Sequence, residues 1–65
     1  MNRYRVRYYL PQRKTYRSRV IVVWADSPGL VVKEARKKIR KNETRKGEPF
    51  LLIWLRDDDG KYLSF

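Results

Sequence analysis

The chain has 65 residues, and its 17 Lys and Arg against seven Asp and Glu give a formal net charge of +10. A chain of this length predicts one domain, residues 1–65, with a small core. It contains no Cys and no His, which argues against disulfides, the usual zinc sites and the commonest acid–base and thiol catalysis. We therefore expect a protein that is not an enzyme and needs no metal or cofactor.

The N-terminal residues lack the apolar stretch of a secretion signal. The longest apolar run, Val20 to Ala25, is far shorter than the ~20 residues that span a bilayer. We expect a soluble, cytoplasmic protein without a membrane partner.

The first predicted element is a strand that ends at Leu10. Apolar and polar residues alternate along it with period two, which is typical of a strand with one buried and one exposed face. Pro11 to Lys14 interrupts the pattern and predicts a hairpin loop. Tyr16 to Ala25 is rich in β-branched and aromatic residues and predicts a second, antiparallel strand. The inward residues of the first strand are expected to be Tyr4, Val6, Tyr8 and Leu10, and the outward ones Arg3, Arg5, Arg7 and Tyr9.

A helix is predicted to follow. Ser27 is suited to capping its free amides, and Pro28 suits the first helical position. Asn42 and Gly47 bracket the expected end. Helical spacing predicts that the buried stripe consists of Val31, Val32, Ala35 and Ile39.

The rest of the chain predicts a third strand and a hairpin. Phe50 to Leu55 is an apolar run of strand length, and Arg56 to Gly60 is expected to form a turn that contains the strong hairpin dipeptide Asp59-Gly60. Asp57 to Gly60 lacks the ligand spacing of a calcium loop and is expected to be a solvated turn. Lys61 to Phe65 is expected to return as a short edge strand. The order predicts a small α+β domain of the ββαβ(β) type, with one helix packed on a three- to four-stranded sheet.

Val23-x-Ala25-Asp26-Ser27, leading into a helix that contains Ala35, resembles the corresponding part of many small ββαβ proteins. The order of elements is also similar to the β-grasp layout of ubiquitin-like domains and to that of archaeal ribosomal protein LX. The resemblance covers most of the chain as topology and hydrophobic spacing. It carries no residue motif and implies no particular function.

The predicted sheet has more apolar surface than one helix covers. In the second strand either the even-numbered residues from Val20 to Trp24 or the odd-numbered ones from Ile21 to Ala25 face the helix. The same choice stays open for the third strand, between the set beginning at Phe50 and the set beginning at Leu51. Strands that are apolar on both sides usually lie in sheets covered on both sides. We therefore expect an apolar patch on the outer face, beside the first-strand arginines, and such patches mark interaction sites.

Positive charge is concentrated in two parts of the chain. Residues 1–25 contain seven basic residues and no acidic one, and residues 33–46 contain eight basic and two acidic. Alternate arginines of the first strand lie roughly 6.6 Å apart on one face, which suits phosphate contacts. Arg17 and Arg19 join them only if the even-numbered residues of the second strand face the helix. The further candidates for phosphate contact are Lys33, Arg36, Lys37 and Arg40, and the candidates for base stacking or for an interface are Tyr9, Trp24 and Trp54.

The favoured interpretation is a non-catalytic protein that binds DNA or RNA through a basic sheet face and helix, with low sequence specificity. The alternative is an interaction or adaptor module that binds an acidic protein partner. It would form a homodimer through the second face of the sheet.

Overall fold

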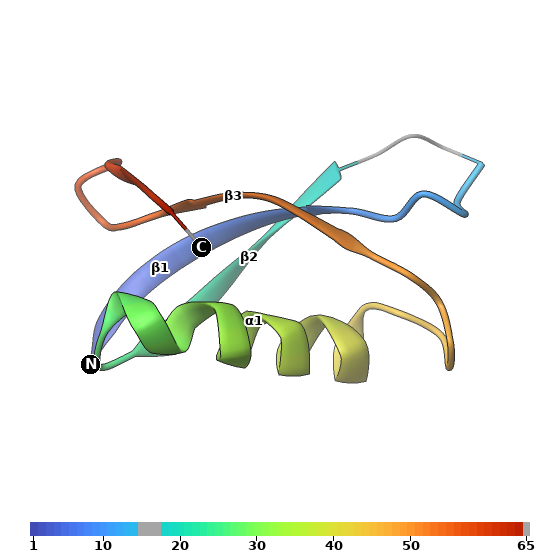
Figure 1. The fold of residues 1–65 in the computed structure, drawn as a ribbon, viewed down its shortest axis with the longest axis horizontal. Helices are drawn as coiled ribbons and strands as arrows, with labels where there is room; N and C mark the ends of the chain where they lie inside the picture. The colour runs from blue at the N-terminus through green and yellow to red at the C-terminus, as the bar shows by residue number, and fades with distance from the viewer. Residues whose placement is uncertain (15–17, 65) are drawn as a thin grey trace.

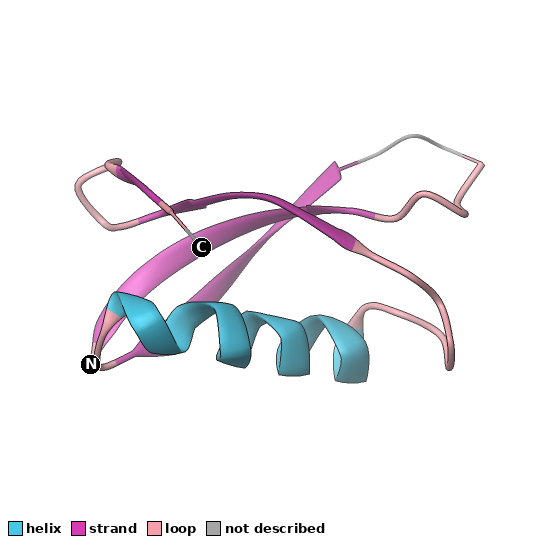
Figure 2. Cartoon of the chain, viewed as in Figure 1, coloured by secondary structure: helices cyan, strands magenta, loops and turns pink. Residues whose placement is uncertain are grey.

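A computed structural model describes residues 1–14 and 18–64. The elements follow in the order β1 (Asn2–Tyr9), β2 (Ser18–Ala25), α1 (Pro28–Asn42), β3 (Leu51–Arg56) and β4 (Tyr62–Leu63). All neighbouring strands are antiparallel, in the order β2-β1-β3-β4, and α1 lies across one face of the sheet (Figure 1). Figure 2 shows the two layers, helix below and sheet above. The predicted α+β class, with one helix on a small sheet, is confirmed.

The face of the sheet toward α1, here called the inner face, holds the core. Tyr4, Val6 and Tyr8 of β1 are buried there, as is Leu10 just beyond the strand. Because α1 turns once every 3.6 residues, one stripe of it meets the sheet. The buried helix residues are Val31, Ala35 and Ile39, each 0% exposed.

The orientation of β2 is set by its pairing with β1. Tyr4 lies opposite Val23 and Val6 opposite Ile21, so the odd-numbered residues of β2 share the inner face. Ile21 and Val23 are buried, whereas Trp24 is 57% exposed. The even-numbered residues therefore face away from the helix, on what we call the outer face.

A bulge determines which residues of β3 reach the core. Arg7 lies opposite Trp54 and Tyr8 opposite Leu52, so Ile53 has no counterpart on β1. An extra residue of this kind interrupts the alternation of a strand. Leu55 is buried and Leu52 packs against the core, although they are three residues apart. Neither alternating set predicted for this run is correct as a whole, because the strand changes phase within it.

The helix begins where the sequence predicts, but its first turn is capped differently. Ser27 occupies the N-cap position without a side-chain hydrogen bond, and Pro28 follows it. At the other end the Glu43 amide donates to the Ile39 carbonyl at 2.9 Å. Within the described ranges, no helix has the length and apolarity needed to cross a membrane.

Candidate nucleic-acid interface

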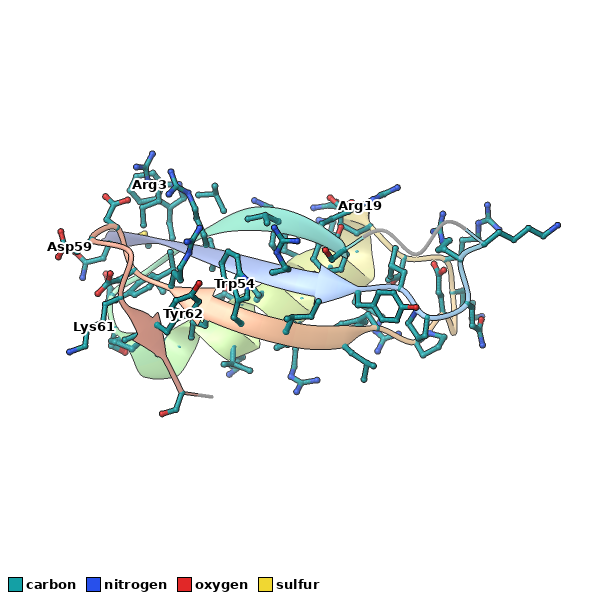
Figure 3. All side chains as sticks on the ribbon, turned by 90° about the horizontal axis from the view of Figure 1, so that it is seen from above. Arg3, Arg19, Trp54, Asp59, Lys61 and Tyr62 are labelled. Carbon is teal, nitrogen blue, oxygen red and sulfur yellow. The ribbon has the colours of Figure 1, made fainter. Side chains whose placement is uncertain are left out.

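The outer face combines arginines on β1 with apolar side chains on the strands beside it (Figure 3). Arg5 lies between Val22 of β2 and Arg56 of β3. Arg7 lies between Val20 and Trp54 in the next row. The large apolar side chains exposed on or beside this face are Val20, Trp24, Leu51, Ile53 and Tyr62. The predicted patch beside the first-strand arginines is therefore present.

Trp54 forms the centre of an aromatic and cationic stack. The guanidinium carbon of Arg56 lies 4.2 Å from the Trp54 ring centroid, and that of Arg7 lies 5.4 Å from it. Tyr62 packs edge-on against the Trp54 ring, at 5.9 Å between centroids and 88° between planes. Cations over an aromatic face are attracted by its quadrupole. This stack holds two arginines on the surface and leaves Trp54 only partly exposed.

We call Arg5, Arg7 and Arg56 the arginine cluster. None of the three forms an ion pair with an acidic residue in the described part of the chain. Arg7 donates from Nη1 to the Ser18 hydroxyl at 2.6 Å, but the buried Nε atoms of Arg7 and Arg56 have no hydrogen-bond acceptor there. Arg5 and Arg56 are direct cross-strand neighbours, and like charges in such positions destabilise a sheet. The cluster is a concentration of uncompensated positive charge.

Arg3 is the exception in the β1 row. The sequence places no acidic residue near it, yet the β3–β4 turn brings Asp58 to 2.8 Å from Arg3. In the same turn, Asp57 accepts from the amides of Asp59 and Lys61, which makes its carboxylate part of the turn itself. Arg3 is thus partly neutralised, whereas Arg5 and Arg7 of the same row form no ion pair in the described chain.

Arg19 does not join the β1 row. It pairs with Tyr8 in the strand register and shares the odd-numbered side of β2, and its guanidinium lies 3.6 Å from the Glu43 carboxylate. The condition for its joining, that even-numbered residues face the helix, is not met. Arg17 lies outside the described residues. Nearby, burial raises the pKa of the Tyr8 hydroxyl, and the Glu43 carboxylate adds to that rise.

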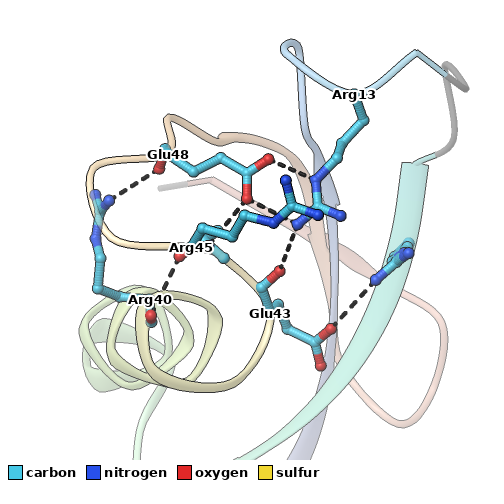
Figure 4. A network of polar contacts seen from close by, with 7 residues as sticks. Arg13, Arg40, Glu43, Arg45 and Glu48 are labelled. Atoms are coloured by element: carbon cyan, nitrogen blue, oxygen red, sulfur yellow. Dashed lines mark hydrogen bonds and ion pairs between the residues drawn. The ribbon is translucent and has the colours of Figure 1, made fainter.

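Arg13 is neutralised inside a polar network at the other end of the sheet, which also includes the Arg40 side chain and the Arg45 backbone amide (Figure 4). Glu48 is 7% exposed and accepts two hydrogen bonds from Arg13, at 2.5 and 2.8 Å. It also accepts a hydrogen bond from the backbone amide of Arg45 at 3.0 Å. The bonds from Arg13, and after them the bond from the Arg45 amide, lower the pKa of Glu48 to about 2. The bonds to Glu48 in turn raise the pKa of Arg13. This network joins the β1–β2 loop to the segment after α1.

The basic residues of α1 lie on the opposite side of the molecule from the arginine cluster. Lys33, Arg36 and Lys37 are exposed on the helix, beneath the sheet in the view of Figure 1. Arg40 donates to the Glu48 carbonyl at 3.0 Å and lies 4.8 Å from the Phe50 ring centroid. The helix candidates therefore do not continue the arginine cluster, although Lys37 lines one groove together with Trp24 at the edge of β2.

The three aromatic candidates differ in exposure and in position. Trp24 is 57% exposed at the end of β2, next to Arg3, while Trp54 is covered by arginines and Tyr9 is half-buried. Arg56 and Tyr62 were not among the predicted site residues, because Arg56 was expected to lie in a turn, whereas it is the last residue of β3. A signal was available, because Arg56 follows Trp54 and Leu55 directly and continues their strand.

No family model, curated protein or solved structure matches the chain.

Proposed function

We propose that the protein binds single-stranded nucleic acid on the outer face of its sheet, with little sequence selectivity. The arginine cluster contacts backbone phosphates, and Trp24 and Tyr62 offer rings on which bases stack. The observation that carries the proposal is that three arginines share one face with no acidic partner in the described chain, beside an aromatic ring that is 57% exposed.

The arrangement suits a single strand better than a duplex. Stacking on a protein ring requires a base that is not already stacked between neighbours, and single strands supply such bases. A positively charged surface with aromatic rings is the combination that non-selective single-strand binders use. Exposed Trp24 and Tyr62 lie on β2 and β4, and the arginine cluster lies on the strands between them.

Low selectivity follows from the side chains available. Asn and Gln are the side chains that read adenine edges, and the chain has only Asn2, Gln12 and Asn42. Asn2 shares the even-numbered side of β1 with the core residues, while the other two lie in a loop and at the end of α1. Phosphate contacts position a strand without reading its sequence.

Nucleic acid also suits this face better than a second copy of the chain does. A two-fold dimer made by stacking outer faces would bring the arginine cluster of one copy toward that of the other, because β1 lies inside the sheet and not at its edge. Like charges brought together in an interface disfavour association. A polyanion is attracted by the same charges.

The test is a salt titration with labelled single-stranded oligothymidylate and oligouridylate, followed by fluorescence anisotropy. If all three arginines contact phosphates, log Kobs should fall with log salt with a slope of roughly −2 from the cluster alone. Arg5→Glu with Arg7→Glu should weaken binding roughly tenfold or more at low salt. Arg5→Glu alone is the second variant, because Arg7 also packs on Trp54.

The matched control is Lys33→Glu with Arg36→Glu, which makes the same change of charge on the helix. A surface-specific site predicts a much smaller loss for this control. Equal losses from the two double variants would show attraction to net charge alone, and no binding at low salt would refute the proposal.

A further inference from the structure

The outer edge of β2 is open. β2 ends the sheet order, so only β1 pairs with it among the described strands. The Val22 carbonyl points to this open edge, where it accepts a hydrogen bond from Lys38 Nζ of α1 at 2.8 Å. The amide and carbonyl of a residue in an antiparallel strand point to the same side, so the Val22 amide lies along the edge too. The edge therefore offers one donor and one acceptor to an added strand.

A groove of about 290 Å³ runs beside this edge, between β2 and α1. Its sheet side is apolar, with Val22, Val23 and Trp24. Its helix side is mainly basic and carries Lys37, Lys38 and Lys41. The other two helix residues that line it are Glu34 and Asn42. The groove thus combines an open strand edge, an apolar floor and a row of lysines.

We infer that this groove binds an extended acidic peptide of a partner protein as an additional strand beside β2. The peptide backbone pairs with the Val22 amide and carbonyl, and Lys38 exchanges its bond to that carbonyl for a carboxylate of the peptide. Alternate peptide side chains that are apolar lie against Val22 and Trp24. Flanking Asp and Glu residues face Lys37 and Lys41. Strand addition of this kind takes its affinity from main-chain hydrogen bonds and its specificity from the side chains that line the groove.

Other occupants fit this site less well. A nucleic-acid strand satisfies the lysines, but it has no regular alternation of amides and carbonyls to continue a sheet. A second copy joined edge to edge through β2 would place the lysine rows of the two helices close together. That contact is opposed by charge, and Lys residues at a strand edge are a known guard against such pairing. An acidic peptide satisfies both the edge and the lysines.

The probe is an array of synthetic peptides with a short core of alternating Val and Thr, flanked by Asp and Glu. Companion peptides carry Lys in place of the acids, or a Pro in the core that prevents strand pairing. We expect binding of the acidic, uninterrupted peptides only. In amide hydrogen exchange, the Val22 amide should become protected on binding.

Two protein variants separate the contributions of charge and backbone. Lys37→Glu with Lys41→Glu should reduce affinity roughly tenfold or more. Lys33→Glu with Arg36→Glu, the same charge change away from the groove, should have a far smaller effect. Val22→Pro removes the edge amide without removing a bond to β1, and it should abolish binding if its amide spectrum shows an intact fold.

Binding that is indifferent to the Pro in the peptide core, or equal loss in both charge variants, would overturn strand addition. Preference of the groove lysines for oligothymidylate over every peptide would overturn the choice of partner. Arg56→Glu, on a strand that does not border β2, should leave peptide binding unchanged, so failure here is distinguishable from failure of the nucleic-acid proposal.

Discussion

The two faces of β1 differ in burial and in charge. Val6 is 1% exposed on the inner face, while its neighbours Arg5 and Arg7 lie on the outer face with no acidic partner in the described chain. The inner face is closed by α1. The outer face is closed by no described element, and its arginines cover Trp54 only in part.

The inner residues of β1 contribute to stability, whereas its outer arginines are proposed to contribute to binding. Burial of the inner residues stabilises the folded protein. The outer arginine cluster gains little from folding, since like charges lie together there. Sequence positions one residue apart should therefore respond differently to substitution.

Substitutions within the core should give the largest effect. Ile39→Ala removes a fully buried side chain and should lower the free energy of unfolding by about 2–5 kcal/mol, measured by urea denaturation. Arg5→Ser on the outer face should change it by no more than ~0.5 kcal/mol. A destabilisation by Arg5→Ser as large as that by Ile39→Ala would contradict the separation of the two faces.

Removal of the exposed indole ring should come next. Trp24→Ala should weaken oligothymidylate binding by about 1–3 kcal/mol, the contribution of one stacked base. Leu51→Ala is the control, because Leu51 is 58% exposed but has no ring on which a base can stack. Fluorescence anisotropy gives both affinities. Equal losses for the two variants would indicate apolar contact without stacking.

A smaller effect is expected from a substitution that places an acidic residue beside the arginine cluster. Val20 lies opposite Arg7 and is 42% exposed. Val20→Glu should pair with Arg7 and reduce affinity for nucleic acid by roughly threefold to tenfold, about the contribution of one phosphate contact. Leu30→Glu makes the same charge change at an exposed helix position. It should leave affinity nearly unchanged, and the reverse ranking would place binding on the helix.

The Glu48 network should give the most gradual effect, a dependence of stability on pH. The pKa of Glu48 is lowered from 4.5 to about 2, so its ion pair stabilises the folded protein fully above pH 4.5 and is lost as the pH falls toward 2. Glu48→Gln should lower the melting temperature at neutral pH and remove part of the acid dependence. The exposed Glu34→Gln should retain the parent profile. Parallel pH profiles for Glu48→Gln and the parent would contradict this assignment.

Much of the fold is predictable from local patterns in the sequence. The alternation before Leu10 identified the faces of β1, and Ser27-Pro28 located the start of α1. The orientation of β2 was not predictable, because Val20 to Ala25 is apolar on both sides and only pairing with β1 decides between them. The interruption of the alternation in β3 was not predictable either, because it also lies within a continuous apolar run.

The candidate site was predictable only in part. Arg5 and Arg7 follow from alternation, whereas the pairing of Arg3 with Asp58 joins residues 55 positions apart and leaves no local signal. Arg56 enters the site because β3 lies beside β1. Long-range pairing, not residue type, therefore decided which cations lack an acidic partner.

The bulge at Ile53 makes the length of β3 as important as its composition. If Ile53 instead took a regular place opposite Tyr8, the half of the strand before it would turn over, provided that the half after it keeps its register. Leu52 would then move to the solvent side and Leu51 to the helix side, with no amino acid exchanged for another. Related chains that lack one residue at this position should therefore keep the present residue types on its N-terminal side, because regular pairing then leaves Leu52 opposite Tyr8.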